Sequence, residues 1–237
     1  MANGSIYGVE ALSRWTHPKF GSVSPASFIP LAEECGLIHD LSDWVLTEVC
    51  NQLAVWRQRG LQIPCVSINL SPLSFHNRNL SQRIFSELTK HNLPPSSLTV
   101  ELTEGVLLDT NPTTLQVLDD IHQMGIGLAI DDFGTGYSSL SYLQKIPIKE
   151  LKLDISFVTD VHSDATSKAL SQAIIQIGNS LNLDVVAEGV EENLQLAELK
   201  AQGYHIGQGF LFSKPLQPDE LEKWMQTNMD RLQNHCR

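Results

Sequence analysis

The sequence predicts one α/β domain of repeated βα units, which would close into a (β/α)8 barrel or form an open doubly wound sheet. Three observations support this prediction. Short runs rich in Ile, Val and Leu alternate with longer amphipathic stretches along the 237 residues. No linker, low-complexity tract or break in composition interrupts the chain, so a single domain over residues 1–237 is expected. About seven strands can be counted, one fewer than a closed barrel needs.

The expected elements follow one another in a regular order. The candidate strands are Ser5–Leu12, Ile63–Leu70, Ser97–Thr103, Ile126–Asp131, Glu150–Asp154, Leu183–Gly189 and His205–Phe212. Helix-like stretches between them include 25–37, 41–60, 112–125 and 165–182. Several of these end at the Gly or Asn that is typical of a helix C-cap. Because the chain begins almost inside its first strand, we expect a missing N-terminal strand to account for the shortfall.

Composition narrows the class of protein. The formal net charge of −11 at pH 7, with no basic run to offset it, argues against binding to nucleic acid polymers or anionic membranes. The four cysteines form no C-x-x-C pair and the eight histidines show no zinc-type spacing, which is typical of reduced thiols in a cytoplasmic protein. No apolar run approaches the ~20 residues of a membrane span, and no signal-peptide core is present. We expect a cytoplasmic domain without membrane insertion, which is compatible with a membrane-anchored parent protein.

Residues that can bind a metal recur at or just past the carboxyl ends of the predicted strands. They are Glu10, Asn69, Glu101, the adjacent Asp131 and Asp132, and Glu188. In a parallel barrel these ends lie on one face, so the side chains would converge, with Lys152 and Gln208 on the same rim. Taken singly, each acidic residue is more typical of a helix N-cap or a solvated turn, and Lys152 of an ordinary surface lysine.

As a group, these oxygen ligands favour a metal site. Crowded carboxylates raise one another's pKa and destabilise a fold unless cations neutralise them. Oxygen ligands without histidine or thiolate favour Mg²⁺ or Mn²⁺ over Zn²⁺. The adjacent Asp131 and Asp132 suit a two-metal arrangement, in which one carboxylate bridges both ions while its neighbour holds the second. Lys152 would then stabilise negative charge beside them.

A series of motifs covers the chain from Tyr7 to Pro215. They are Glu10-Ala11-Leu12 followed by Arg14-Trp15, then SINLSP, VELTE, DDFGTGYSS, LKLD, AEGVE and QGFLFSKP. Together they resemble the EAL domain, the bacterial phosphodiesterase that opens cyclic di-GMP. The resemblance implies a modified (β/α)8 barrel whose first strand is antiparallel to the rest. The Tyr-Gln-Pro-Ile-like segment of that strand is missing here, so we expect an N-terminally shortened EAL domain from a larger protein.

For the metal site, the resemblance implies two ions at the strand ends. The ligands would be Glu10, Asn69, Glu101 and Asp131 for the first ion, and the bridging Asp131 with Asp132 and Glu188 for the second. The ions would be Mg²⁺ or Mn²⁺, whereas Ca²⁺ is expected to be inhibitory, supporting binding but not turnover.

The resemblance also implies roles for residues around the metals. Lys152 would contact the attacking water, and Glu188 would be a metal ligand, a general base or both. The other expected positions are Arg14 on substrate phosphate, Asp154 and Gln208 near the substrate, and Glu104 as the anchor of the DDFGTGYSS loop. In that loop Gly134 and Gly136 permit a tight, movable turn, although the segment is also compatible with a simple βα turn.

The function implied is hydrolysis of cyclic di-GMP to linear pGpG, which would lower this bacterial second messenger. Two alternatives remain open: a non-catalytic receptor for cyclic di-GMP, and a different metal-dependent phosphoesterase on a barrel. The expected partners are cyclic di-GMP, a second copy of the chain in a homodimer, and flanking regulatory domains in a larger protein.

Overall fold

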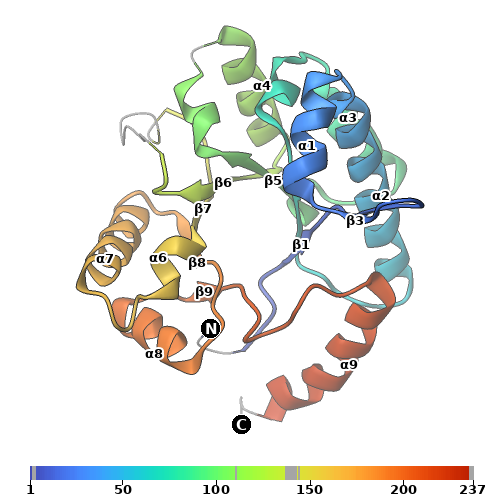
Figure 1. Cartoon of the computed structure of the whole chain (residues 1–237). Helices are drawn as coiled ribbons and strands as arrows, with labels where there is room; N and C mark the ends of the chain where they lie inside the picture. The colour runs from blue at the N-terminus through green and yellow to red at the C-terminus, as the bar shows by residue number, and fades with distance from the viewer. Residues whose placement is uncertain (2–3, 110, 137–142, 144, 235–237) are drawn as a thin grey trace. The chain divides into compact units, whose positions relative to one another are not determined.

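Strands and helices alternate in the computed structural model as the sequence predicts (Figure 1). The structure describes residues 1, 4–109, 111–136, 143 and 145–234. It divides into two compact units. The N-terminal unit is Gly8–Leu128, and the C-terminal unit consists of Met1–Tyr7 with Ala129–Arg237.

Three parallel strands form the sheet of the N-terminal unit. They are β1 (Val9–Ala11), β4 (Val66–Asn69) and β5 (Leu98–Thr103), in the order β1-β4-β5. All residues of β5 except Thr103 are buried, as expected for a parallel strand covered on both faces. The register places Glu10 opposite Ser67 and Asn69 opposite Glu101. The polar residues predicted at the strand ends therefore lie at neighbouring positions.

Helices and 3₁₀ turns connect these strands. The helices are α1 (Pro25–Glu34), α2 (Ile38–Gln58), α3 (Leu80–Lys90) and α4 (Pro112–Gln123), and the 3₁₀ turns are η1 (Pro72–His76), η2 (Pro95–Ser97) and η3 (Glu104–Leu108). Proline occupies an initial position of both α1 and α4, where its missing N–H removes no helical hydrogen bond. The helix α2 buries Val45, Leu46, Val49 and Leu53, the spacing of an amphipathic helix.

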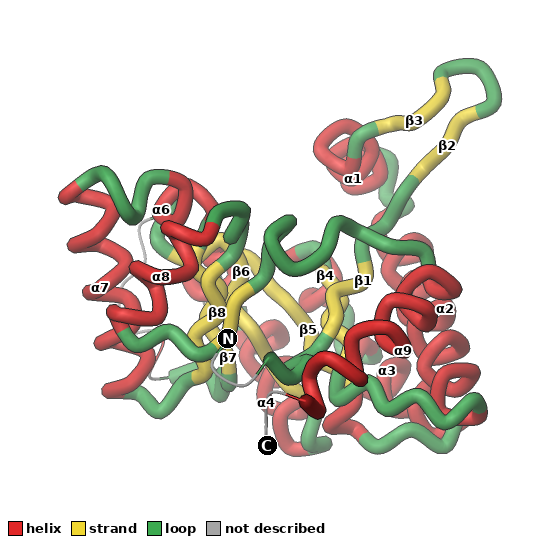
Figure 2. Tube along the Cα trace, turned by 90° about the horizontal axis from the view of Figure 1, so that it is seen from below, coloured by secondary structure: helices red, strands yellow, loops and turns green. Residues whose placement is uncertain are grey.

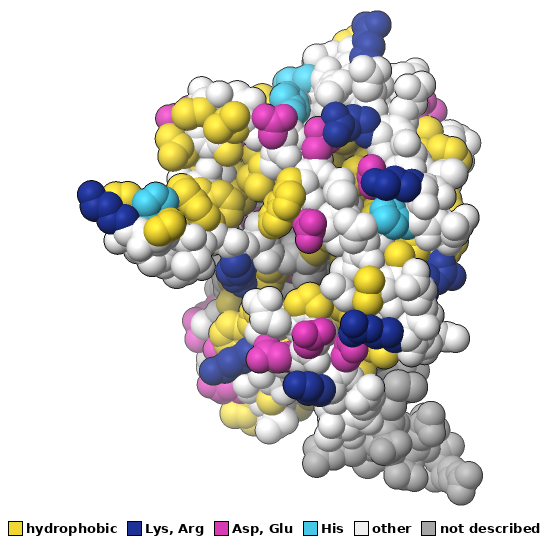
Figure 3. Space-filling view, turned by 90° about the vertical axis from the view of Figure 1, so that its right-hand side faces the viewer, with side chains coloured by type: hydrophobic (Ala, Val, Ile, Leu, Met, Phe, Trp, Pro, Cys, Tyr) yellow, Lys and Arg dark blue, Asp and Glu magenta, His cyan; other side chains and the backbone are white. Residues whose placement is uncertain are grey.

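A short antiparallel hairpin in this unit was absent from the predicted elements. Its strands are β2 (Trp15–His17) and β3 (Gly21–Val23). Strands of three residues are too short to show a period of two, which explains why the sequence pattern did not indicate them. The hairpin extends beside α1 in Figure 2, and in Figure 3 it carries hydrophobic, basic and histidine side chains.

Four parallel strands form the sheet of the C-terminal unit. They are β6 (Gly127–Phe133, which starts in the N-terminal unit), β7 (Glu150–Leu153), β8 (Asp184–Ala187) and β9 (Ile206–Gly207), in chain order. The helices are α6 (Ile155–Thr159), α7 (Ala165–Ser180), α8 (Asn193–Gln202) and α9 (Pro218–Asn234). The predicted strand His205–Phe212 shrinks to two residues because a turn begins at Gly209, whose carbonyl accepts a hydrogen bond from the N–H of Phe212 at 3.1 Å.

No helix among the described residues combines the length and the apolar character needed to cross a bilayer.

Candidate metal centre

The end of β6 brings two adjacent carboxylates to one side of the C-terminal sheet. Successive residues of a regular strand point to opposite faces, so Asp131 and Asp132 would ordinarily diverge. Here the register with β7 shifts between Ile130 and Phe133, because three steps on β6 oppose two on β7. This β-bulge contains Asp132 at φ +53°, a left-handed conformation that Asp adopts more readily than most residues. One carboxylate oxygen each from Asp131, Asp132 and Glu188 consequently lies within 4.8 Å of the others.

Lys152 occupies the strand between these carboxylates. Its Nζ lies 3.1 Å from Oδ1 of Asp131 and 2.8 Å from Oε1 of Glu188, and its side chain is only 2% exposed. The prediction of Lys152 on the rim with the acidic residues agrees with this position, whereas a surface lysine does not. A lysine this deeply buried keeps its charge only when anions compensate for lost hydration. The ion pairs therefore hold Asp131 and Glu188 at fixed positions around the ammonium.

The electrostatics of Asp132 indicate a shortage of positive charge. Desolvation, the neighbouring Asp131 carboxylate and Asp154 together raise the pKa of Asp132 to about 6, against an opposing contribution from Lys152. Asp154 is the N-cap of α6, where its Oδ1 accepts a hydrogen bond of 2.9 Å from the backbone N–H of Ser156. A divalent cation would relieve the repulsion that raises this pKa. The donor set, three carboxylates without nitrogen or sulfur, fits Mg²⁺ or Mn²⁺.

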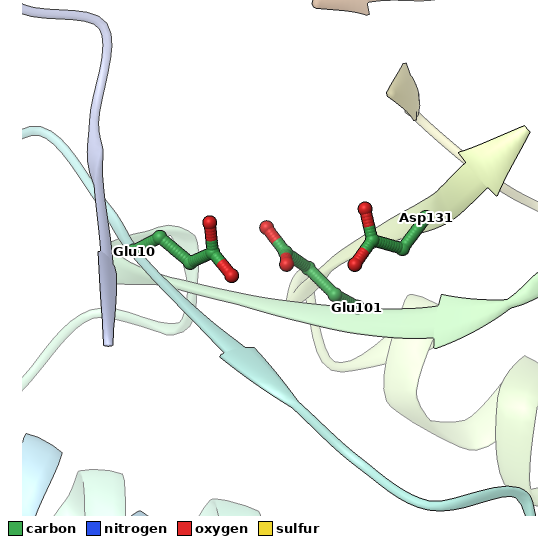
Figure 4. A group of neighbouring side chains, drawn as sticks. All are labelled: Glu10, Glu101 and Asp131. Carbon is green, nitrogen blue, oxygen red and sulfur yellow. The ribbon is translucent and has the colours of Figure 1, made fainter. Parts of the chain in front are cut away.

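The N-terminal unit contains a second group of oxygen ligands. Nδ2 of Asn69 donates a hydrogen bond of 2.7 Å to Oε1 of Glu10, which leaves the Asn69 carbonyl oxygen as its potential ligand atom. Carboxylate oxygens of Glu10 and Glu101 lie within 4.8 Å of each other. Figure 4 shows these two side chains pointing toward each other from β1 and β5, and it also draws Asp131 on β6. Glu101 is 1% exposed, so its carboxylate has lost almost all hydration and requires compensation from its surroundings.

Two of the predicted substrate-binding residues follow strand ends in different units. The exposed Arg14 lies between β1 and β2, and its guanidinium donates to the carbonyl of Ser13 at 3.0 Å. The backbone of Gln208 donates to the carbonyl of Ala187 at 2.8 Å and accepts from the N–H of Val190 at 2.9 Å. These two bonds tie the segment after β9 to the loop that carries Glu188.

The predicted loop residues also divide between the units. Glu104 is the first residue of η3 in the N-terminal unit and is 6% exposed. Gly134 has φ +103° in the C-terminal unit, which agrees with the tight turn expected there. The last part of the motif, Tyr137 to Ser139, lies outside the described residues.

Sequence reasoning missed two residues, Ser71 and Glu33, near the group of Glu10, Asn69 and Glu101 in the N-terminal unit. Ser71, two positions after Asn69, is the N-cap of η1, and its hydroxyl donates a hydrogen bond of 2.6 Å to Oε1 of Glu33 on α1. Ser followed by Pro72 is a recognisable start of a helical turn, so the cap itself had a local signal. The contact with Glu33, at a separation of 38 residues, had none.

Comparison with known proteins places the chain among related signalling proteins. The EAL domain family model matches residues 1–215. The oxygen sensor protein DosP of Escherichia coli strain K12 is 42% identical over 222 residues, which are 94% of this chain and 28% of DosP. The bifunctional diguanylate cyclase/cyclic di-GMP phosphodiesterase MucR of Pseudomonas aeruginosa is 42% identical over 219 residues, which are 92% of this chain and 32% of MucR.

A solved structure supports the same relationship. The PaMucR phosphodiesterase in complex with c-di-GMP matches with a TM-score of 0.87 and 42% identity, over 92% of this chain and 89% of that one. This likeness confirms the predicted fold class, an α/β fold of the modified (β/α)8 barrel type. The chain spans about three tenths of the length of the two curated relatives.

Proposed function

This chain belongs to the EAL domain family, and on that premise we propose that it is a metal-dependent phosphodiesterase that hydrolyses cyclic di-GMP to linear pGpG. The observation that carries the proposal is the group of three carboxylates around buried Lys152. Such a group has no evident structural use at the end of a strand, whereas two divalent cations and a phosphodiester would use every member of it.

We assign the metal ligands as the family resemblance implies. Glu10, Asn69, Glu101 and Asp131 would hold one ion, and Asp131, Asp132 and Glu188 the other. Bound Mg²⁺ or Mn²⁺ would supply a water of lowered pKa and would neutralise phosphate charge. This neutralisation matters because the chain has a net charge of −11 and the substrate is a dianion.

The chain's own residues would orient and stabilise the reacting groups. The Lys152 ammonium lies on the carboxylate group, so it would stabilise negative charge that develops on phosphate in the transition state. Glu188, whose Oε1 lies 2.8 Å from Nζ of Lys152, would accept a proton from the attacking water, bind metal, or do both. Arg14 would bind a substrate phosphate, and Asp154 and Gln208 would contact the substrate.

Two further proposals concern the parent protein and the assembly of this chain. Because the curated relatives are much longer than this chain, we propose that regulatory domains flank it in its parent protein. We also propose that it forms a homodimer, as the family resemblance implies, with Glu104 anchoring the loop that contains Gly134 and Gly136.

The test is a chromatographic assay of purified protein with cyclic di-GMP and Mg²⁺ or Mn²⁺, following pGpG over time with an EDTA control. Metal-dependent pGpG formation is expected, and Asp131→Asn should abolish it. Asp119→Asn on the exposed face of α4 is the matched control and should keep full activity.

Other outcomes separate the alternatives. Tight binding of cyclic di-GMP without product would favour a non-catalytic receptor. Faster turnover of linear dinucleotides or aryl phosphates would favour a different phosphoesterase. Retention of most activity by Asp131→Asn would contradict the proposed site.

A further inference from the structure

The hydrogen bond between Ser71 and Glu33 lies next to the Asn69 end of β4. Its length of 2.6 Å is that of a charge-assisted O–H···O⁻ bond, which is about twice as strong as a neutral one. Both side chains are half-buried, so water competes less for the bond than it would on an open surface.

Glu33 is placed unfavourably for its own helix. It lies in the last turn of α1, where the helix dipole is negative and a carboxylate is destabilising. Helix stability therefore does not explain an acidic residue here. The bond to the Ser71 hydroxyl, which lies outside α1, explains why a carboxylate stands at this position.

Ser71 transmits this contact to the metal-ligand segment. Its hydroxyl oxygen also accepts the backbone N–H of Leu73 at 3.3 Å, which caps η1. The backbone of the intervening Leu70 donates to the carbonyl of Glu101 at 3.1 Å. Asn69, two residues before Ser71, is thus held between a β-ladder on one side and a capped turn on the other.

Two further contacts stabilise η1 at positions more distant from Asn69 in the sequence. The hydroxyls of Ser42 and Ser74 lie 3.1 Å apart, and Nε2 of His76 lies 3.0 Å from Oδ2 of Asp109. These contacts fix the middle and the end of the turn. The Glu33 contact lies at its beginning, where a shift of the backbone moves Asn69 directly.

We propose that Glu33 is a positioning residue for the metal site: through Ser71 it fixes the turn after β4, so that Asn69 keeps its amide bonded to Glu10 and its carbonyl oxygen directed to a cation. This inference rests on the proposed function, because it takes Asn69 as a metal ligand. Groups that hydrogen-bond a metal ligand typically change metal affinity by 10- to 100-fold when they are removed. Glu33 acts one contact farther out, through Ser71, so we expect the lower end of this range.

The experiment measures Mn²⁺ binding to the metal-free protein by calorimetry and by electron paramagnetic resonance, without nucleotide. Glu33→Ala and Ser71→Ala should each weaken one Mn²⁺ equivalent about tenfold, the same equivalent that Asn69→Ala weakens. Glu33→Gln keeps an oxygen acceptor for Ser71 and should restore most of the affinity. Glu34→Ala, at the exposed neighbouring position of α1, should leave Mn²⁺ binding unchanged.

A double-mutant cycle distinguishes positioning from a general structural effect. If Glu33 acts through Asn69, Glu33→Ala in the Asn69→Ala background should cause no further loss. Additive losses, or unchanged affinity in Glu33→Ala, would overturn the inference. Equal losses in Glu33→Gln and Glu33→Ala would overturn it too, because charge rather than the hydrogen bond would then be responsible. Ser42→Ala, which breaks the Ser74 contact, should lower thermal stability without changing Mn²⁺ affinity.

Failure of this inference and failure of the proposed function can be told apart. A wild-type protein that binds Mn²⁺ but releases no pGpG contradicts the proposed function and leaves the binding test of Glu33 intact. A wild-type protein that makes pGpG, combined with normal Mn²⁺ affinity in Glu33→Ala and Ser71→Ala, contradicts the inference alone. If Glu33→Ala does not fold, Ser71→Ala and Glu33→Gln carry the test.

Discussion

Lys152 shows how one buried charge organises its neighbours. An ammonium that is 2% exposed has lost its hydration, and the carboxylates of Asp131 and Glu188 replace it. Such an arrangement is weak evidence for stability, because a well-packed apolar side chain often stabilises a fold as much as a buried ion pair does. It is better explained by chemistry that needs a fixed positive charge.

Lys152→Met tests this explanation, because it removes the charge and keeps much of the volume. We expect kcat for cyclic di-GMP to fall by about 10²- to 10³-fold, the typical effect of losing one donor to a developing negative charge. The KM should change far less, since the charge acts mainly in the transition state. Steady-state kinetics measures both values. The control is Lys168→Met, because Lys168 is an exposed residue of α7 whose ion pair with Glu198 of α8 lies outside the site. An equal loss in substrate affinity would contradict this role for Lys152.

Asp132 makes stability depend on pH. Its pKa is about 6 in the folded chain and 3.8 ordinarily, so the folded state binds more protons than the unfolded state between these values. The free energy of unfolding of the metal-free protein therefore decreases as pH rises through this window. In EDTA, Asp132→Asn should raise the Tm relative to wild type at pH 7 but not at pH 4. Asn tolerates the φ of +53°, so the variant changes charge with little added backbone strain.

Thermal unfolding at both pH values measures this effect. A Tm difference that is the same at pH 4 and pH 7 would show that packing, not titration, is responsible. With saturating Mn²⁺ at pH 7 the order should reverse, because wild type gains stability from metal that the variant binds less well.

The bulge in β6 is the feature that turns a strand end into a candidate metal site. Without the extra residue, Asp131 and Asp132 would point to opposite faces of the sheet and could not bind the same cation. A similar need for special backbone geometry occurs after β8. Gly189 has φ +67°, and a Cβ added there would lie 2.2 Å from Cγ1 of Ile155 on α6.

Gly189→Ala should therefore lower the free energy of unfolding by more than the cost of placing Ala in a left-handed conformation. That conformation accounts for about 1–2 kcal/mol in the free energy of unfolding, and the overlap with Ile155 adds to it. Gly203→Ala is the matched control, because Gly203 has φ +100° and nothing within 4 Å of the added Cβ. Urea unfolding of both variants measures the difference. Equal losses in the two would falsify the claim that the contact with Ile155 matters.

Metal binding should be visible in the stability of the whole chain. A ligand that binds only the folded state stabilises it by about 2.7 kcal/mol at 100 times its dissociation constant. We expect Mn²⁺ and Ca²⁺ both to raise the Tm, because both accept carboxylate oxygens. Turnover of cyclic di-GMP should occur with Mn²⁺ and not with Ca²⁺, whose looser coordination activates water poorly. Full-rate hydrolysis with Ca²⁺ would require a different account of the metals.

Much of the fold was predictable from local sequence. The strand predicted at Glu150–Asp154 is β7 at Glu150–Leu153, and the one predicted at Ser97–Thr103 is β5 at Leu98–Thr103. The agreement is good because both segments alternate apolar and polar residues, ELKL in β7 and LTVELT in β5, which is the period of two of a strand. Prediction was poorer for β9, where a turn interrupts the run, and absent for the hairpin β2–β3, whose strands are too short for a detectable period.

By itself, the sequence determined which oxygen-bearing residues stand at the strand ends, and so which donors are candidates for a metal, because strand periodicity and residue type are local properties. Only the tertiary structure decided how those residues are used. It buried Lys152 between Asp131 and Glu188, turned Asp132 through the bulge, and placed Glu33 against Ser71. These outcomes depend on packing between segments far apart in the chain, where desolvation and register set the geometry, and no local pattern records them.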